Sequence, residues 1–254
     1  MDALSEALLA VRTTGAIFIR VECIAPWGFA VPDVYKTADL LAPGTGRIVN
    51  YHLVTEGRAL VRLEGKEAFW AEAGDIVILP YGDAHTVSNG RPSRYVDSAV
   101  APGQLFTARP GTIRLGGGEG ETTRIICGFI GCQRSADRLF LSGLPHSIRI
   151  KLGGEPSDSW LTRTIEHLVC EAEADQPGAS ILLSRAAESI FVDALRRFMR
   201  GLSPEHTGWL AAARDTVVGA ALATLHRAPA RSWTIEQLAR EVGSSPSALN
   251  KRFL

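Results

Sequence analysis

The sequence predicts a mainly β-sheet domain followed by α-helices, and three observations support this prediction. Up to about residue 150, short apolar segments alternate with Gly- and Pro-containing turns at intervals typical of β-sandwiches and barrels. Beyond that point, apolar residues recur at helical spacing. The 254 residues, of which 46% are hydrophobic, suffice for one large or two modest domains.

The β-rich part contains seven segments that are expected to be strands, with turn-forming residues between them. We take the last of these segments as the final strand of a barrel. The expected strands are Ala16–Ile24, Ile48–Thr55, Ala59–Leu63, Ile76–Leu79, His85–Ser88, Thr112–Leu115 and Thr123–Phe129.

Three helices are expected after the strands, over Ser157–Glu173, Ala179–Met199 and about Trp209–His226. The second carries a broad apolar stripe, formed by Ile181, Leu182, Ala186, Ile190, Phe191, Ala194, Leu195 and Phe198. Such a stripe favours either a homodimer contact or packing onto the barrel, and both alternatives stay open. The expected domains are residues 1–150, a helical linker at 151–205 and a third domain at 206–254.

Charge and composition limit the possible functions. Lys and Arg (27) balance Asp and Glu (27), so a large basic surface for nucleic acid is not expected, although a small basic patch is compatible. No apolar run approaches the roughly 20 residues that span a bilayer. The acidic N-terminus is unlike a signal peptide, and we expect a cytoplasmic protein without a membrane partner. In that compartment the four cysteines are expected to be core residues or metal ligands rather than disulfides.

The most specific motif runs from Gly74 to Asn89. It has the spacing G-x5-P-x-G-x2-H-x3-N, with Pro80, Gly82 and His85 at the inner fixed positions. This spacing matches the second motif of the cupin family at every fixed position. It predicts a double-stranded β-helix barrel in which a strand, a tight corner and a returning strand direct His85 into the interior.

The first cupin motif is degenerate in this sequence. Counted back from Gly57, its His, His and Glu metal ligands would fall at Pro43, Thr45 and Asn50. The usual three-His, one-carboxylate site is therefore not expected. This departure counts against an enzyme that needs such a metal, for example a dioxygenase.

His52 offers a partial replacement, because it lies two residues beyond Asn50 on the same face of its strand. His52, His85, Cys127 and Cys132 would form a four-ligand set suited to Zn²⁺ if glycines 128 and 131 bend the last strand. The alternative is that the histidines are hydrogen-bonded interior residues that recognise a ligand and the cysteines are core residues.

The C-terminal segment has the pattern of a helix-turn-helix. Thr234 and Gln237 form a capping box that begins a helix, and Gly243 is expected to end it in the left-handed conformation. Ser245 can cap a second helix that has Pro246 at its first position.

The second of these helices has a distinct inner and outer face. Leu249 and Phe253 are four residues apart and are expected to pack it on the first helix. Ser247, Asn250 and Lys251 are left outside, on the face that enters the DNA major groove in this motif. The alternative is an ordinary pair of packed helices with a solvated, charged face.

Taken in order, these residues resemble the AraC family of bacterial transcription regulators whose sensor is a cupin. The resemblance covers nearly the whole chain. It rests on Trp209–Asp215 and Trp233–Ala239 for the DNA-binding domain, and on Ala25–Gly28, Tyr51–Gly57, Cys127-Gly128 and Leu144-Pro145 for the sensor domain.

The resemblance implies a ligand-responsive regulator. A small effector would bind in the barrel at Asn50, His52, Trp70 and His85, with Tyr51 as a further candidate, and would modulate DNA binding. The family's DNA-binding domain has two helix-turn-helix units, whereas this sequence ends inside the first recognition helix. We therefore expect this chain to bind operator DNA weakly or not at all.

Two other functions stay open at this point. One is a metal-dependent cupin enzyme with a helical appendage, which would need a metal with an open coordination position. An enzyme is not expected, because the first-motif ligands are missing and no Ser-His-Asp set, phosphate loop or carboxylate pair supports other chemistry. The second is a regulator that acts only by heterodimerising with an intact partner.

Overall fold

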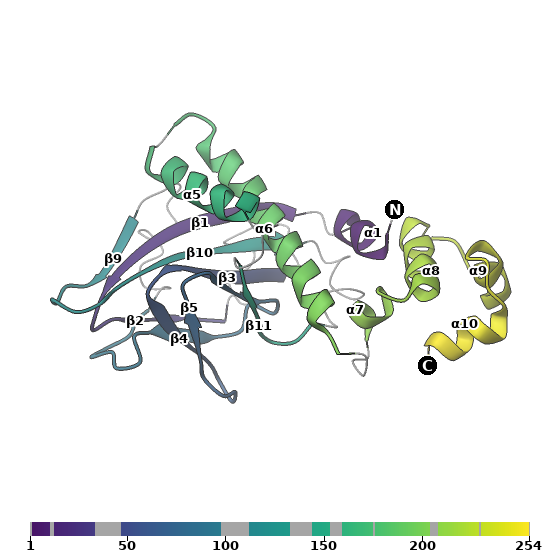
Figure 1. The fold of residues 1–254 in the computed structure, drawn as a ribbon, viewed down its shortest axis with the longest axis horizontal. Coiled ribbons are helices and arrows are strands. Elements are labelled where there is room, and N and C mark those ends of the chain that lie inside the picture. The colour runs from purple at the N-terminus through teal and green to yellow at the C-terminus, as the bar shows by residue number, and fades with distance from the viewer. Residues whose placement is uncertain are drawn as a thin grey trace. The chain divides into compact units, whose positions relative to one another are not determined.

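The computed structural model describes residues 2–10, 13–33, 47–97, 112–132, 144–152, 159–174, 176–203, 208–228 and 230–253 (Figure 1). The chain divides into two compact units. The larger unit comprises residues 13–132 and 145–196, and the smaller unit comprises residues 1–12, 133–144 and 197–254. The expected linker helices therefore belong mostly with the barrel, and the N-terminal residues belong with the C-terminal helices.

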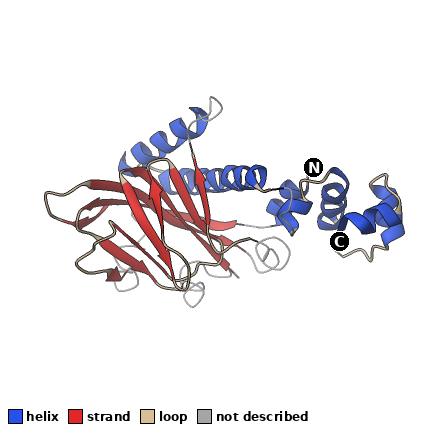
Figure 2. Cartoon of the chain, turned by 60° about the horizontal axis from the view of Figure 1, so that its bottom comes forward, coloured by secondary structure: helices blue, strands red, loops and turns tan. Residues whose placement is uncertain are grey.

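The larger unit contains two β-sheets (Figure 2). Neighbouring strands are antiparallel, except for the parallel pairs β1–β9 and β2–β8. The first sheet has the order β11 (Ile148–Lys151), β6 (Asp75–Leu79), β3 (Arg47–Glu56), β10 (Thr122–Cys132), β1 (Thr13–Ile24) and β9 (Thr112–Gly116). The second has the order β5 (Phe69–Glu72), β4 (Arg58–Leu63), β7 (His85–Ser88), β2 (Gly28–Val31) and β8 (Val96–Asp97).

All seven expected strands are present, and four short ones within the described residues were missed. Strands β2, β5, β8 and β11 have two to four residues each, which is too short for an alternating pattern to be recognised. The strand that was expected to be the last of the barrel runs to Cys132. It is not the last strand of the sheet, because β11 follows it in the sequence and pairs with β6.

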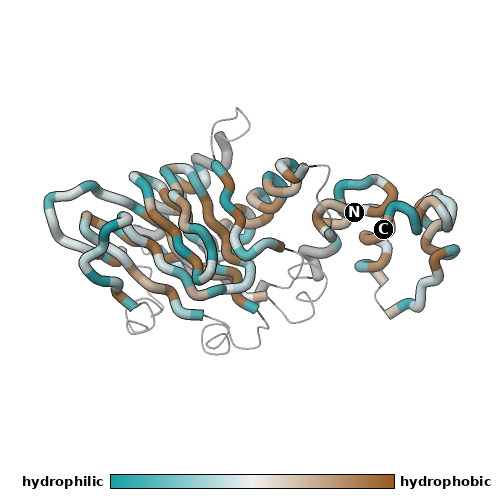
Figure 3. Tube along the Cα trace, turned by 90° about the horizontal axis from the view of Figure 1, so that it is seen from below, coloured by the Kyte–Doolittle hydropathy of each residue, from teal (hydrophilic) through white to brown (hydrophobic). Residues whose placement is uncertain are grey.

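The core of this unit lies on the inner face of the six-stranded sheet. It includes Val54, Val77, Ile125 and Cys127, together with Trp27, Phe29, Val61, Leu63 and Val87 from the region of the second sheet. The opposite face of β3, β6 and β10 is also apolar and meets α5 (Ser159–Ala174) and α6 (Ala179–Gly201). Strand β6 is therefore buried on both faces, which explains its continuous apolar sequence. Figure 3 colours the chain by hydropathy, and hydrophobic (brown) segments lie among the strands.

Helix α6 directs most of its apolar stripe into this interface. Its buried residues include Leu183, Ala187, Ile190, Phe191, Ala194 and Leu195. By contrast, Ile181 is 67% exposed and Leu182 is 43% exposed, so the first turn of the apolar stripe is not covered within this chain. The stripe packs within the chain, and a homodimer through this helix stays a prediction.

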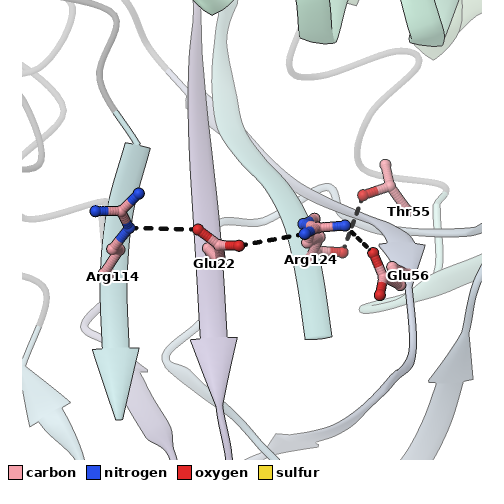
Figure 4. A network of polar contacts seen from close by, with 5 residues as sticks. All are labelled: Glu22, Thr55, Glu56, Arg114 and Arg124. Atoms are coloured by element: carbon pink, nitrogen blue, oxygen red, sulfur yellow. Dashed lines mark hydrogen bonds and ion pairs between the residues drawn. The ribbon is translucent and has the colours of Figure 1, made fainter. Parts of the chain in front are cut away.

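A row of alternating charges crosses four adjacent strands of the six-stranded sheet (Figure 4). Arg114 on β9 donates to Glu22 on β1 at 3.3 Å, and Glu22 accepts a second bond from Arg124 on β10 at 3.3 Å. Arg124 also pairs with Glu56 at the end of β3, while the Thr55 hydroxyl donates to the Arg124 carbonyl oxygen at 3.1 Å. These cross-strand pairs support the strand register, including the parallel pairing of β9.

The smaller unit is helical. It contains α1 (Ala3–Ala10), α7 (Trp209–Ala212), α8 (Thr216–Arg227), α9 (Ile235–Glu241) and α10 (Pro246–Phe253). Helix α1, which the sequence did not predict, packs on α8 and forms an ion pair of 3.3 Å between Glu6 and Arg227. The expected single helix from Trp209 is two helices, because the Asp215 side chain caps α8.

Helices α9 and α10 form the expected helix-turn-helix. The capping box of Thr234 and Gln237 is present, and Gly243 has a φ of +66°. Ser245 accepts a hydrogen bond from the backbone of Ala248 at 3.2 Å and so caps α10. In the described part of the chain, no helix has both the length and the apolar character needed to cross a bilayer.

The packing of α10 confirms one expected contact and corrects another. Leu249 is fully buried with Ala221 of α8 and with Leu238 and Ala239 of α9. Phe253 is 43% exposed, so the expectation that it also packs on the first helix is wrong. The buried anchor of α10 is therefore Leu249.

Candidate functional site

Two histidines meet inside the β-sheet unit because a strand and a tight corner direct them toward each other. His52 lies on β3, on the same face as the core residue Val54. The corner before β7 contains Gly82, which has a φ of +65° and donates a backbone hydrogen bond to Leu79. His85 is the first residue of β7, and its Nε2 lies 2.7 Å from Nε2 of His52.

The histidines belong to a longer chain of hydrogen bonds. Nδ1 of His85 is 2.7 Å from the carbonyl oxygen of Asp83, and Nδ1 of His52 is 3.1 Å from Sγ of Cys127. A carbonyl oxygen only accepts, so a neutral His85 carries its proton on Nδ1 and accepts at Nε2. His52 must then donate from Nε2 and accept at Nδ1. The Cys127 thiol is therefore the donor at the start of a chain that runs in one direction to Asp83.

Burial keeps the side chains that form this series of hydrogen bonds neutral. His52 and His85 are only 4% and 3% exposed, and Cys127 is 8% exposed. Burial lowers the pKa of His52 well below its usual range and lowers the pKa of His85 to about 4, although the hydrogen bond to Asp83 opposes the second shift. Burial also raises the pKa of the Cys127 thiol.

Two buried N–H donors near this chain have no hydrogen-bond partner in the structure. Nδ2 of Asn50 is one, and Asn50 is 4% exposed and lies two residues from His52 on the same face of β3. Nε1 of Trp27 is the other; its ring stacks on Phe29, which in turn contacts the ring of His52 with centroids 6.0 Å apart. Unpaired buried donors are costly and favour a ligand that brings an acceptor.

A cavity of about 490 Å³ opens beside His85. Val31 and Leu63, the last residues of β2 and β4, are the register partners of His85, so this cavity lies at the ends of the strands. Ala30 and Pro32 add apolar lining, and the rim carries Arg62, Glu64, Lys66 and Asp97. Of the hydrogen-bonded side chains, His85 lines this cavity, whereas His52 and Cys127 do not.

The other two residues expected to contact a ligand, Trp70 and Tyr51, lie away from the hydrogen-bonded histidines. Trp70 is next to the core residue Ala71 on β5 and points to the opposite face, where the Arg58 guanidinium lies 4.6 Å from its ring centre. Tyr51 faces the helices α5 and α6. The structure therefore brings Asn50, His52 and His85 together, but not Trp70 or Tyr51.

The expected zinc ligands are only partly brought together. The ladder between β10 and β3 runs without interruption from Ile125 to Cys132, so the expected bend at the glycines is not found. Cys132 is five residues beyond Cys127 and points to the other face of the strand. Its sulfur is 4.0 Å from the carbonyl oxygen of Ile130.

The remaining three groups do not fit a common metal ion as they stand. Cys127 lies at Nδ1 of His52 and His85 lies at Nε2, so the two neighbours are on different sides of one ring. Within the described ranges, no three His, Cys, Asp or Glu side chains form a metal-binding group. Of the first-motif positions, Pro43 and Thr45 lie outside the described residues, and Asn50 is no usual ligand. The zinc site stays a prediction, tested by the zinc content of protein purified without chelators.

The expected DNA-reading residues lie on the surface of α10. Ser247, Asn250 and Lys251 are all exposed. Sequence reasoning missed a contact behind them: Arg252 of α10 lies 2.6 Å from Asp215, the residue that caps α8. An Asp directly before a helix indicates an N-cap, so the capping role of Asp215 could be predicted. No sequence signal indicated that Asp215 would also contact Arg252.

Comparison with known proteins identifies the family. A cupin family model matches residues 2–200. The chain belongs to the cupin family. The cupin region is that of an AraC-like transcription regulator, since the relatives that match it over its full length are regulators of this kind.

Two relatives illustrate the match. The RCS-specific HTH-type transcriptional activator RclR of Escherichia coli K12 is 25% identical over 254 residues, covering 100% of this chain and 75% of the relative. The HTH-type transcriptional regulator AlkR of Acinetobacter baylyi is 26% identical over 259 residues, covering 100% of this chain and 79% of the relative. Neither is named as an enzyme.

Solved structures resemble the cupin region and its helices more distantly. ToxT of Vibrio cholerae, crystallised with an unsaturated fatty acid, aligns with 94% of this chain and 73% of its own, at 8% identity and a TM-score of 0.38. The AraC-like transcriptional activator CuxR aligns with 91% of this chain and 68% of its own, at 12% identity and a TM-score of 0.33.

Proposed function

We propose that this AraC-like regulator responds to a small effector that binds at the strand-end cavity of its cupin region. The observation that carries the proposal is the cavity of about 490 Å³ that opens beside His85, at one end of a buried hydrogen-bond chain. The unpaired donor of Asn50 supports it, because an interior N–H without a partner is expected to serve a ligand.

The effector acts by binding one arrangement of the protein more tightly than another. A ligand shifts such an equilibrium only by its difference in affinity for the two states. The helix-turn-helix of α9 and α10 is the part whose DNA binding would change, and its expected DNA contacts are Ser247, Asn250 and Lys251. Asn suits a bidentate contact with adenine, whereas Lys suits phosphate. A regulator of this kind works in the bacterial cytoplasm, where the DNA is.

Native mass spectrometry of the purified 254-residue protein tests the effector site. We expect a co-purifying small molecule that is released on denaturation and is missing from His85→Leu. Trp70→Phe is the matched control, because Trp70 is not among the residues that line the cavity and its variant should retain the molecule. Equal retention by both variants contradicts the proposed site.

A gel-shift assay tests the DNA-binding part. We expect weak binding that is reduced further by Asn250→Ala, and a salt dependence that falls by about one counterion in Lys251→Ala. A sub-micromolar, sequence-selective complex would contradict the expectation that this chain binds operator DNA weakly.

A further inference from the structure

We propose that the effector is a zwitterion, namely an α-amino acid with an apolar side chain. Arg62 binds its carboxylate, Asp97 binds its ammonium group, and its apolar side chain lies at the strand ends. This inference rests on the proposed function, because it names the chemical class of molecule that the strand-end cavity takes. It follows from the order of four residues across one sheet and from the charge and polarity of the cavity lining.

Four of the residues that line the cavity form a row across neighbouring strands of the five-stranded sheet. Arg62 on β4 is the register partner of Thr86 on β7. Thr86 in turn pairs with Ala30 on β2, and Ala30 pairs with Asp97 on β8. Leu63, the next residue on β4, belongs to the core, so the side chains of the row point to the opposite, outer face.

The row places a cation and an anion on opposite sides of a low floor. Neighbouring strands lie about 4.8 Å apart, so three strand spacings separate the Cα atoms of Arg62 and Asp97 by about 14 Å. The two residues between them, Thr86 and Ala30, have small side chains. Because the stem of Arg62 is long and flexible, its guanidinium can close on a small ligand that lies over this floor beside Asp97. The space therefore suits a ligand whose two opposite charges are a short distance apart.

The charge of the lining also favours a zwitterion. Among the described residues, the lining includes two positive side chains, Arg62 and Lys66, and two negative ones, Glu64 and Asp97. A ligand with a single charge would be attracted by one pair and repelled by the other. A zwitterion can use both, since charge-assisted hydrogen bonds form with guanidinium and with carboxylate groups.

His85 does not disturb this balance. Burial lowers its pKa to about 4, so the imidazole adds no charge to the cavity at neutral pH. Its Nδ1 lies 2.7 Å from the Asp83 carbonyl oxygen and its Nε2 lies 2.7 Å from Nε2 of His52. Because both ring nitrogens already have partners, the polar ends of the ligand are left to the charged side chains.

The strand ends offer a place for an apolar side chain. Val31 and Leu63 are the last residues of β2 and β4, and Pro32 and Ala84 lie with them in the lining. The volume of about 490 Å³ is within the range of about 300–1,000 Å³ that is usual for small-molecule sites. Burial of an aliphatic group against these residues adds affinity, so apolar amino acids are preferred over glycine.

The test is isothermal titration calorimetry on the dialysed 254-residue protein, with L-leucine as the probe. Glycine lacks the apolar side chain, isocaproate lacks the ammonium group and isoamylamine lacks the carboxylate. We expect L-leucine to bind with a Kd of about 1 mM or tighter, and each of the three analogues to bind at least about tenfold more weakly.

Two variants separate the charged contacts. Arg62→Gln and Asp97→Asn should each weaken L-leucine binding by about tenfold or more, and both positions are exposed, so the variants are expected to fold. Arg58→Gln is the matched control. Arg58 lies on the same face of β4 but packs on the Trp70 ring at 4.6 Å and does not line the cavity, so this variant should bind L-leucine normally.

Other results would overturn the inference. Absence of L-leucine binding, equal affinity for the analogues that lack one charge, or equal binding by Arg62→Gln and Arg58→Gln would each do so. If L-leucine does not bind but a co-purifying molecule is still lost in His85→Leu, the zwitterion class is wrong and the effector site stands. If His85→Leu also retains that molecule, the site itself is wrong.

Discussion

Asp215 links the start of α8 to α10, the helix expected to read DNA. One carboxylate oxygen accepts the backbone N–H groups of Val217 and Val218, both at 2.9 Å. The other oxygen lies 2.6 Å from Nη1 of Arg252 on α10. Asp215→Ala removes all three contacts, whereas Asp215→Asn retains a cap and loses the ion pair.

The two contributions differ in size. Loss of an N-cap costs about 1 kcal/mol. The ion pair is worth less than about 1 kcal/mol, because the side chains of Arg252 and Asp215 are 50% and 33% exposed and solvent screens the attraction. Asp215→Ala should therefore lower the free energy of unfolding by about 1.5–2 kcal/mol, and Asp215→Asn and Arg252→Gln by about 0.5 kcal/mol each.

Urea unfolding of the helical signal and amide hydrogen exchange at Val217 and Val218 measure these effects. Exchange at both amides should accelerate strongly in Asp215→Ala, but only slightly in Arg252→Gln. A double-mutant cycle between Asp215→Ala and Arg252→Ala should give a coupling below about 1 kcal/mol. Equal losses in Asp215→Asn and Asp215→Ala would refute the reasoning, because they would assign the whole effect to the charge.

Three further outcomes are expected in the same unit. Leu249→Ala should destabilise it by about 2–5 kcal/mol in urea unfolding, since this side chain is fully buried between α8 and α9; a loss below about 1 kcal/mol would show that α10 is anchored elsewhere. Gly243→Ala should cost about 1 kcal/mol through its positive φ alone, because an added Cβ meets nothing within 4 Å; an unchanged denaturation midpoint would contradict this. The hydrogen bonds from Val218 and Val217 and the nearby Arg252 hold the pKa of Asp215 below its usual range, so its stabilisation is complete above about pH 4 and lost as pH falls through the folded pKa. Acid unfolding of Asp215→Asn should therefore begin from a lower stability but show a shallower pH dependence, and parallel curves would argue against this.

Local patterns predicted much of the fold correctly. The spacing from Gly74 to Asn89 indicated the corner that directs His85 inward, and that corner is present. The capping box at Thr234 and the positive φ of Gly243 were also predictable. Each of these features depends on backbone geometry over a few residues, so the information lies within the segment itself.

Contacts between distant segments needed the folded chain. The sequence suggested that His52 and His85 face each other, but the one-way hydrogen-bond chain from Cys127 depends on the register of β3 against β10. The same register turns Cys132 away, and the register of β4 against β5 turns Trp70 outward. A shift of one residue reverses the face of every side chain in a strand, so no local pattern could decide these positions.

The amino-acid sequence by itself determined the order of the barrel, the linker helices and the helix-turn-helix, because periodicity, caps and turns act locally. Only the tertiary structure decided that α1 packs on α8, that Asp215 contacts Arg252 and that Asn50 has an unpaired donor beside His52. These features join residues far apart in the chain, and their positions follow from packing and strand register rather than from the preferences of any one segment.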